Sequence, residues 1–457
     1  MERGSARPRR DGVLRLLSLE LTFADERCAA ALADEMLLAA MASFEAALAR
    51  ASAACGLVPA AAAEAIADVC AGASFDALAL ARKARQAGTL AIPFVKALTD
   101  KVAAVSPPAA RYVHFGATSQ DVIDTAVALC HRRAAARLLE LARAMGDALA
   151  ELARRHAETP MLARTLLQPA APVPFGWKAA MWLAPLSRSL PRLRAAVDDA
   201  CVLQFGGASG TLAAFGERAG KLAERLAAEL KLERRVTWHS SRDAWARYGA
   251  EMAILCGISA KIAGDVALLM QAEVGEAAEP AAAGRGGSSS MPHKRNPAIS
   301  MLALEAGRRA PGLAATLLGE LQNEHERGIG QWQSQWMTLR ELSCATASAT
   351  AAMVEVLGAL VVNPAAMRAN IEETRGLVFS EALALRTSRK LAERLCAQAA
   401  NEKRHLREVV QADAEATRLL SPTDIDALFE PRAAYGAAAG MTGEVLSDWA
   451  KARESAP

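Results

Sequence analysis

The stretch 126–156, AVALCHRRAAARLLELARAMGDALAELARRH, indicates the fold of this chain more clearly than any other segment. Its large apolar residues follow one another at steps of three, four, four and three: Leu138, Leu141, Met145, Leu149 and Leu152. This spacing places them on one face of an α-helix, and a long helix buries such a face against neighbouring helices. The stretch therefore predicts a long helix within a bundle.

Similar long helices are predicted further along the chain. The same steps return in a second set of apolar residues: Leu255, Ile258, Ile262, Val266 and Leu269. Another helix is expected over 298–327, kinked or interrupted at Pro311, and one more from just after Gly330 to about Gly358. An amphipathic helix is also expected over 41–54. Long helices joined by short breaks are typical of a bundle.

Composition supports an all-α fold. The chain is 52% hydrophobic but only 4% aromatic, is rich in alanine, and has almost no strand-like alternation. Its 457 residues are enough for roughly three domains of about 150 residues each. We predict a disordered leader (1–12), an N-terminal helical domain (13–110), a central long-helix bundle (111–360) and a C-terminal helical domain (361–457).

Charge and cysteine patterns exclude several classes of protein. The net charge of +3, from 53 basic and 50 acidic residues, is too balanced for an electrostatic nucleic-acid binder. The eight cysteines are scattered without zinc or redox spacing, which predicts buried, reduced thiols. We find no signal-peptide pattern and expect no stretch that could span a bilayer. A soluble, cytoplasmic protein without membrane or nucleic-acid partners is expected.

The loop 284–297, GRGGSSSMPHKRNP, carries the densest set of reactive side chains. A Gly/Ser stretch is usually a flexible linker, but a linker seldom continues into such a polar run. Lys294 and Asn296, two residues apart, can bind one carboxylate by charge and hydrogen bond. A nearby serine could act as a base if its oxyanion were stabilised, and the glycines permit closure over a substrate.

A second polar cluster, His114 to Asp121 (HFGATSQD), precedes the first long helix. Thr118 or Ser119 is expected to cap that helix, whose free N–H groups form an anion site. Capping alone would explain both hydroxyls, but it does not explain His114.

Two further segments are less specific. The run 164–169, RTLLQP, begins a proline-rich break before a helix near Trp177 and by itself is structural. The run 204–211, QFGGASGT, predicts a turn or a close backbone approach to a ligand.

Together these four patterns resemble the fumarase/argininosuccinate lyase/adenylosuccinate lyase superfamily over nearly the whole chain. Its signature, GSSxMPxKxNP, stands at 287–297. The resemblance implies three helical domains and a homotetramer in which four bundles form a common core. It also implies active sites built from three chains and small polycarboxylate substrates. No metal, nucleotide or redox cofactor is implied.

The resemblance also assigns roles to individual residues. Ser288 matches the serine that abstracts the proton, and Lys294 and Asn296 match the carboxylate-binding pair. Thr118 and Ser119 match carboxylate-binding hydroxyls. The remaining matches are a substrate-contacting histidine, His114, and a substrate-binding glutamine, Gln204.

Two loop arginines, Arg285 and Arg295, are further candidates for binding a tricarboxylate. Solvated loop charges are the equal alternative for both side chains.

The chain departs from most branches of this superfamily at two positions. The general acid, a histidine in the motif Arg-Thr-His, is replaced by Leu166, and its partner glutamate is replaced by Met301. An amine or hydroxide must be protonated to leave, whereas a carboxylate, with a pKa of about 4, leaves or attacks without an acid. Losing both acid groups together therefore favours a reaction of an internal carboxylate.

The predicted activity is accordingly that of the cycloisomerase branch, which opens or closes a lactone on a muconate-type tricarboxylate. Other segments resemble this branch, among them 325–328 (HERG) and 332–336 (WQSQW). The alternatives are an amine-releasing lyase that forms fumarate and a catalytically inactive helical scaffold.

Overall fold

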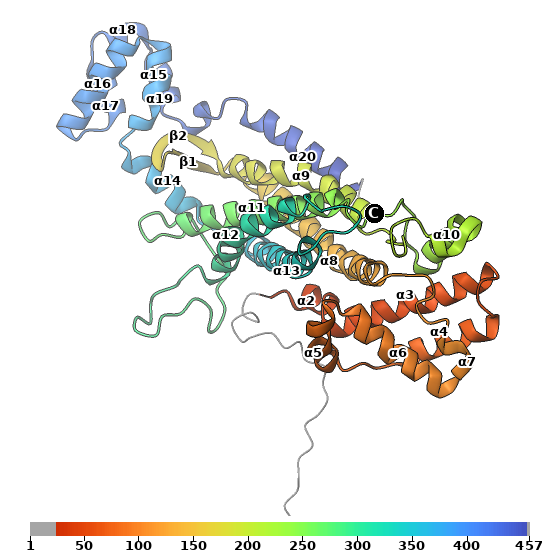
Figure 1. Cartoon of the computed structure of the whole chain (residues 1–457). Coiled ribbons are helices and arrows are strands. Elements are labelled where there is room, and N and C mark those ends of the chain that lie inside the picture. The colour runs from red at the N-terminus through yellow and green to blue at the C-terminus, as the bar shows by residue number, and fades with distance from the viewer. Residues whose placement is uncertain (1–23, 455–457) are drawn as a thin grey trace, which may run out of the picture. The chain divides into compact units, whose positions relative to one another are not determined.

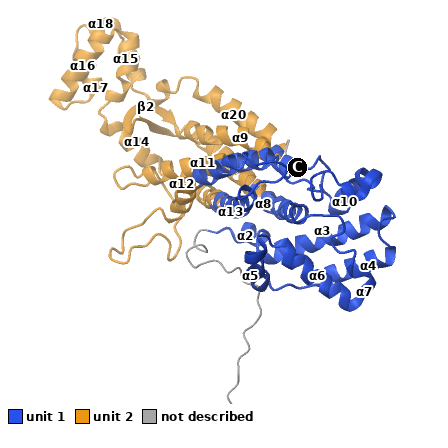
Figure 2. Cartoon of the chain, viewed as in Figure 1, with its two compact units in different colours: residues 1–138, 195–253, 310–348 blue, residues 139–194, 254–309, 349–457 orange. Residues whose placement is uncertain are grey.

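The computed structural model describes residues 24–454, so the predicted leader 1–12 lies outside the described residues. The chain divides into two compact units (Figure 2). Unit 1 comprises 1–138, 195–253 and 310–348, and unit 2 comprises 139–194, 254–309 and 349–457. The prediction of three domains at other boundaries stays a prediction.

The long helices contribute residues to both units (Figure 1). They are α8 (Ser119–Arg155), α9 (Phe175–Ala200), α11 (Asp243–Leu269), α12 (Ala298–Gly319) and α13 (Gln331–Gly358). Unit 1 also contains α2 (Glu26–Ala31), α3 (Asp34–Ala54), α4 (Ala60–Gly72), α5 (Ala77–Ala87), α6 (Ala91–Val105), α7 (Pro107–Ala110), the 3-10 turn η1 (Ala213–Arg218) and α10 (Ala219–Leu230).

Unit 2 adds two small antiparallel sheets and the C-terminal helices. The sheets pair β1 (Pro160–Thr165) with β2 (Gln168–Pro174), and β3 (Ala277–Ala278) with β4 (Val361–Val362). The helices are α14 (Pro364–Glu373), α15 (Ser380–Arg386), α16 (Arg389–Glu402), α17 (Leu406–Ala412), α18 (Ala416–Leu419), α19 (Pro422–Leu428) and α20 (Ala438–Glu454), with 3-10 turns η2 (Leu377–Phe379) and η3 (Pro431–Ala434).

The all-α prediction is confirmed, and the helix predicted from residues 126–156 is the long α8. All five apolar residues of its predicted stripe are buried, none with more than 3% exposure. The predicted helices at 41–54, 255–269 and 331–358 are also present, within α3, α11 and α13. The expected helix 298–327 is wrong at its end, because α12 stops at Gly319 and residues 320–330 form a loop. Pro311 lies inside α12 without ending it.

Small residues let the helices of unit 1 approach closely. At Gly249 on α11, an added Cβ would lie 2.3 Å from Leu317 Cδ1 on α12. Such close packing explains how an alanine-rich chain forms a dense helical core.

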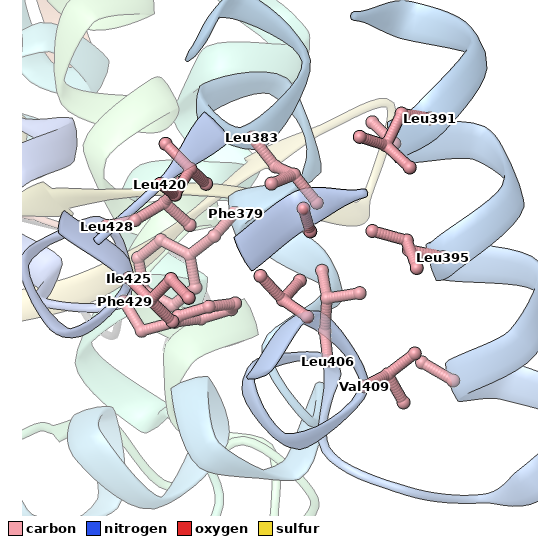
Figure 3. Close-up of a cluster of buried hydrophobic side chains, with 14 of the residues drawn as sticks. Phe379, Leu383, Leu391, Leu395, Leu406, Val409, Leu420, Ile425, Leu428 and Phe429 are labelled. Carbon is pink, nitrogen blue, oxygen red and sulfur yellow. The ribbon is translucent and has the colours of Figure 1, made fainter. Parts of the chain in front are cut away.

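The C-terminal part of unit 2 has a hydrophobic cluster of its own (Figure 3). Phe379, Leu383 and Leu395 are among its members, and each is at most 4% exposed. Ring contacts between Phe379 and Phe429, with centroids 5.6 Å apart, join η2 to the end of α19. This cluster accounts for the shorter helices beyond residue 363, which bury their apolar faces locally.

The cysteines are all free, and five of them are buried: Cys28, Cys70, Cys130, Cys201 and Cys256. The expectation of buried reduced thiols is therefore confirmed for these five, whereas the other three are partly exposed.

One expectation about membrane spans needs correction, because α11 is long and apolar enough, by length and composition, to cross a bilayer. Its residues Met252, Leu255 and Ile262 are buried in the protein, and core helices of soluble proteins pass the same test.

Candidate active site

The signature loop 284–297 belongs to unit 2 and lies in the long connection between α11 and α12 (Figure 1). Its two ends are tied together by a hydrogen bond from Asn296 N to Gly286 O, at 2.8 Å. Gly286 has a φ of +62°, and a Cβ there would lie 2.4 Å from Asn296 O. Only glycine fits this closure, so the loop is a built structure and the alternative of a mere linker is weakened.

Ser288 accepts hydrogen bonds within this loop. The backbone N–H groups of Ser290 and Met291 donate to Ser288 Oγ at 3.3 and 3.1 Å. Two N–H donors aimed at one hydroxyl oxygen stabilise negative charge on it. This arrangement meets the condition for the serine to exchange protons as an oxyanion.

Lys294 and Asn296 line one cavity of about 430 Å³ together with Arg285 and Arg295. This volume is in the range of small-molecule sites, and the three cations suit an anionic ligand. Arg285 is already paired with Glu355, and it also donates to Pro280 O at 3.3 Å. Its charge is therefore less available to a substrate than that of Lys294 or Arg295, both of which are exposed.

Glu279, which was not singled out from the sequence, fixes the end of the loop. Its buried carboxylate accepts from Ile299 N at 3.1 Å and from Ser300 N at 2.6 Å, in the first turn of α12. A carboxylate at a helix N-terminus accepts hydrogen bonds from free N–H groups, and its negative charge interacts favourably with the positive end of the helix dipole. The start of α12 is thus occupied by the protein's own anion.

Leu166 stands at the tip of the β1–β2 hairpin with 97% of its surface exposed. It and Leu167 form a two-residue turn between Thr165 and Gln168, and their φ values are +50° and +64°. Such turns usually contain Asn or Gly, because leucine is strained at positive φ. Met301, in the first turn of α12, is 50% exposed. Both replaced acid positions therefore present apolar surface outside the core.

A buried charge clamp holds this hairpin. The N–H groups of Arg164 Nη1 and Nη2 donate to the two carboxylate oxygens of the fully buried Glu276, at 2.7 and 2.8 Å. Asn370 on α14 donates to the same carboxylate at 2.8 Å. The proline-rich break predicted at 164–174 is thus an ordered hairpin, anchored near its tip.

The polar cluster from His114 to Asp121 lies in unit 1, where α8 begins at Ser119 as expected. Asp121 accepts from Thr118 N at 3.0 Å, and from Gly206 N and Gly207 N at 2.9 Å each. His239 Nε2 contacts the same carboxylate at 2.9 Å. Asp121 thus ties the Thr118 loop to the 204–211 loop, and the helix end carries a carboxylate of its own.

Arg327 is a further cation at this cluster and was named in the sequence only as part of a motif. Its Nη1 donates to Thr118 Oγ1 at 3.1 Å, and its Nη2 donates to Gly207 O at 3.4 Å and to Ala208 O at 3.2 Å. Its Nε is buried without an acceptor among residues 24–454. The Thr118 hydroxyl therefore lies against a guanidinium, which suits a carboxylate ligand.

His114 is held by a residue that the sequence did not single out, Glu45 on α3. Glu45 accepts from His114 N at 2.9 Å and contacts His114 Nδ1 at 2.6 Å. Burial alone lowers the pKa of His114, but the charge of Glu45, its hydrogen bond and the charge of Asp121 together raise it above its ordinary value. His114 is therefore biased towards its cationic form.

The predicted role of Gln204 in binding substrate is not supported. Gln204 is 0% exposed, and its amide donates to Thr237 Oγ1 and accepts from Trp238 N, both at 2.8 Å. Both ends of the amide are engaged inside the protein, so Gln204 fixes the 237–238 segment instead. The prediction of a ligand contact came from the superfamily resemblance and from the glycine-rich turn beside Gln204.

Metal ligation has no support in the described part of the chain. Between residues 24 and 454, no group of three or more His, Cys, Asp or Glu side chains is placed to hold a metal ion.

Comparisons with known proteins identify the family of the chain. A sequence profile of the family described as "Lyase" matches residues 23–312. The chain therefore belongs to this lyase family, within the fumarase/adenylosuccinate lyase superfamily.

Three similar proteins carry names that are more specific than the family description. A 3-carboxy-cis,cis-muconate cycloisomerase from Bradyrhizobium diazoefficiens is 49% identical over 83% of this chain and 86% of its own length. The crystal structure of 3-carboxy-cis,cis-muconate lactonizing enzyme from Pseudomonas putida has a TM-score of 0.91 and 39% identity, over 95% of this chain and 99% of that one. A nitrosuccinate lyase from Streptomyces davaonensis is 41% identical over 84% of each chain.

Proposed function

We propose that this protein is a cycloisomerase that interconverts 3-carboxy-cis,cis-muconate and 4-carboxymuconolactone, the step after ring cleavage of protocatechuate. The observation that carries the proposal is that Leu166 and Met301, both apolar and exposed, stand at the two acid positions of a chain whose Ser288 loop is intact. The relatives named for this reaction support it.

Apolar side chains at Leu166 and Met301 favour a reaction whose leaving group needs no proton. Leu166 projects from a clamped hairpin tip and offers an apolar side chain where the superfamily resemblance expects a proton donor. A lactone opens by releasing a carboxylate, which is stable as an anion and requires no protonation. The reaction thus proceeds without the acid that amine-releasing relatives need.

In the cyclising direction, one substrate carboxylate oxygen adds to a double bond and forms the ring C–O bond. The electron pair moves to the carbon next to a second carboxylate and spreads onto it as an aci-carboxylate. Ser288 then gives its hydroxyl proton to that carbon and becomes an oxyanion, which the Ser290 and Met291 N–H groups stabilise until solvent reprotonates it. In the opening direction the Ser288 oxyanion removes the same proton.

The remaining side chains bind the carboxylates of the substrate. Lys294 and Asn296 bind one of them from the cavity of the signature loop, with Arg295 beside them. Thr118, Ser119 and His114 bind another. Arg327 adds a charge at Thr118 that suits a substrate with three carboxylates.

We also propose that the enzyme works in the cytoplasm as a homotetramer whose active sites combine residues of different chains. The superfamily resemblance is the support for this assembly. Within the single chain, the Ser288 loop belongs to unit 2 and the Thr118 cluster to unit 1.

A second candidate follows from the nitrosuccinate lyase relative. Nitrite, like a carboxylate, is stable as an anion, so the absence of a proton donor fits its release equally well. The three cations of the loop cavity would accept a nitro-substituted dicarboxylate too.

One pair of assays separates the two candidates. Purified enzyme is given 3-carboxy-cis,cis-muconate, with ultraviolet absorbance as the readout, and separately nitrosuccinate, with colorimetric nitrite. We expect turnover of the muconate and little release of nitrite. Rapid nitrite release with no change in muconate absorbance would overturn the proposal.

The role of Ser288 is tested by Ser288→Ala. We expect turnover to fall by about a thousandfold or more, since the proton cannot be delivered. Ser289→Ala is the matched control, because it removes a neighbouring hydroxyl that accepts neither N–H group. The assembly, measured by light scattering, should be unchanged in both variants. Full activity in Ser288→Ala would exclude this serine.

A further inference from the structure

Glu45 is an unusual residue for the middle of a core helix. It lies on α3 among alanines, leucine and phenylalanine, and its side chain is 0% exposed. Burying a carboxylate is costly unless it is paired and hydrogen-bonded, so such residues are rare in cores. A retained buried charge calls for a specific partner.

That partner is His114, which contacts Glu45 twice. The backbone N–H of His114 donates to one carboxylate oxygen at 2.9 Å, and its ring Nδ1 lies 2.6 Å from the other. His114 has a φ of +57°, a conformation that a histidine adopts only at a local cost. The two contacts fix the backbone and the ring together, and Nε2 remains as the ring nitrogen directed away from Glu45.

The other charges around this pair are few. Asp121 on α8 acts on His114, and its carboxylate is shared with His239. Cys70 on α4 faces Glu45 as a neutral thiol, because burial and the charge of Glu45 raise the pKa of Cys70 to about 12. Arg50 acts weakly on the same thiol and is paired with Glu229.

His114 stands four residues before Thr118, in the segment that leads into α8. Glu45 holds His114, Asp121 acts on it through its charge, and both carboxylates favour the protonated ring. A doubly protonated imidazole has no lone pair with which to accept a proton. At this place it donates a charged hydrogen bond through Nε2 to an anionic ligand.

We propose that Glu45 is a positioning residue of the active site, which holds His114 as an oriented imidazolium so that its Nε2–H binds a substrate carboxylate. This inference rests on the proposed function. It assigns His114 to anion binding and leaves proton transfer to Ser288.

A purely structural role for Glu45 is the competing explanation. In that case the carboxylate would only fix the backbone of the 111–118 segment, and the charge of the His114 ring would not matter. The two explanations differ in what happens when the charge is removed but the shape is kept, as in Glu45→Gln.

The first experiment needs no substrate and does not depend on the proposed function. Diethyl pyrocarbonate acylates neutral imidazole only, and peptide mass spectrometry locates the label. In the full-length protein, the pH midpoint for labelling of His114 should lie above that of an ordinary histidine. In Glu45→Gln the midpoint should fall by about one pH unit or more. The exposed His293 serves as the internal reference and should not shift.

The second experiment measures kinetics with carboxymuconate. With wild-type enzyme, kcat/KM should decline at alkaline pH as His114 loses its proton. In Glu45→Gln that decline should begin about one pH unit lower, with KM raised about tenfold at neutral pH and kcat changed far less. Glu45→Asp keeps the charge and should restore the alkaline limb towards that of wild type.

The matched control is Ser52→Ala. Ser52 lies on α3 seven residues beyond Glu45, is also fully buried, and its hydroxyl has no hydrogen-bond partner among residues 24–454. It should leave both the labelling midpoint and the pH profile unchanged.

Two results would overturn the inference. One is a wild-type labelling midpoint for His114 at or below that of His293, which applies even if Glu45→Gln does not fold. The other is a Glu45→Gln midpoint equal to that of wild type. If labelling behaves as expected but wild-type enzyme does not turn over carboxymuconate, the proposed function fails and the Glu45–His114 pairing stands.

Discussion

By the superfamily resemblance, Leu166 matches the position of the proton donor. Its exposure at a clamped tip means that a histidine could be installed there without disturbing the core. We expect Leu166→His to change kcat for the lactone reaction by less than about threefold, because the leaving carboxylate gains nothing from protonation. Steady-state kinetics in both directions is the measurement, with Leu167→His as the control. A gain of tenfold or more specific to position 166 would contradict the leaving-group argument.

His131 is a buried histidine with no role in the proposed chemistry. Its ring packs edge-on against Trp245 and Tyr248, and burial lowers its pKa to about 3. Unfolded histidine titrates at about 6.5, so below that pH the unfolded chain takes up a proton that the folded chain refuses. The free energy of unfolding should therefore be highest above pH 6.5 and fall as the pH drops towards 3.

The effect of His131 is measured by chemical denaturation between pH 7 and 4. His131→Gln should flatten the decline by up to a few kcal/mol, at about 1.4 kcal/mol per pH unit. His293→Gln, at an exposed loop position, is the control and should keep the wild-type slope. An unchanged slope in His131→Gln would mean that His131 is protonated in the folded protein.

At the scale of elements, the β1–β2 hairpin depends on its clamp. Leucines at two positive-φ positions cost about 1 kcal/mol or more each, so tertiary contacts must hold the turn. Glu276→Gln leaves Arg164 partly buried without its charge partner and should destabilise the protein by about 2 kcal/mol. We expect faster proteolysis within 160–174. Glu151→Gln breaks an exposed ion pair and should cost under about 0.5 kcal/mol. Equal effects of the two variants would exclude a clamp.

The long helices were predictable from the sequence because their periodicity is local. The helix α13 has the expected bounds, whereas α8 and α11 contain the predicted apolar stripes but begin earlier in the chain. The β1–β2 hairpin was not predictable, because Pro169, Pro172 and Pro174 argue against a central strand. They are tolerated here because a two-stranded sheet has only edge strands. Likewise, no pattern at 320–327 signalled that α12 would end early.

The candidate site likewise contains residues that the sequence reveals and residues that only the fold reveals. Lys294 and Asn296 stand two residues apart in one loop, so their spacing marked them, and the superfamily resemblance then singled out Ser288 among the three serines. Glu45 could not be found, because its partner is 69 residues away and only the tertiary fold brings the two together. The substrate-binding role of Gln204 stays a prediction, and its burial and internal hydrogen bonds could not be read from a turn-like sequence. Arg327 was visible as part of a motif, but its contact with Thr118 was not.

At the scale of the whole molecule, the proposed tetramer makes a specific claim about which chains supply each site. If Ser288 and Arg327 of one active site come from different subunits, a mixed oligomer of two inactive variants can contain active sites in which both residues are intact. In a mixture of Ser288→Ala and Arg327→Met chains, half of the sites receive an intact Ser288. Half of those also receive an intact Arg327. Random mixing should therefore restore about a quarter of wild-type activity.

Differently tagged Ser288→Ala and Arg327→Met chains are co-expressed, and hybrids that carry both tags are isolated by two affinity steps. Each variant expressed alone, with both tags, is the control and should remain inactive. Activity near a quarter of wild type in the hybrids means that Ser288 and Arg327 of one active site come from different chains. Hybrids of the expected mass that stay inactive would mean that one chain supplies both residues, and the proposed shared site would then have to be abandoned.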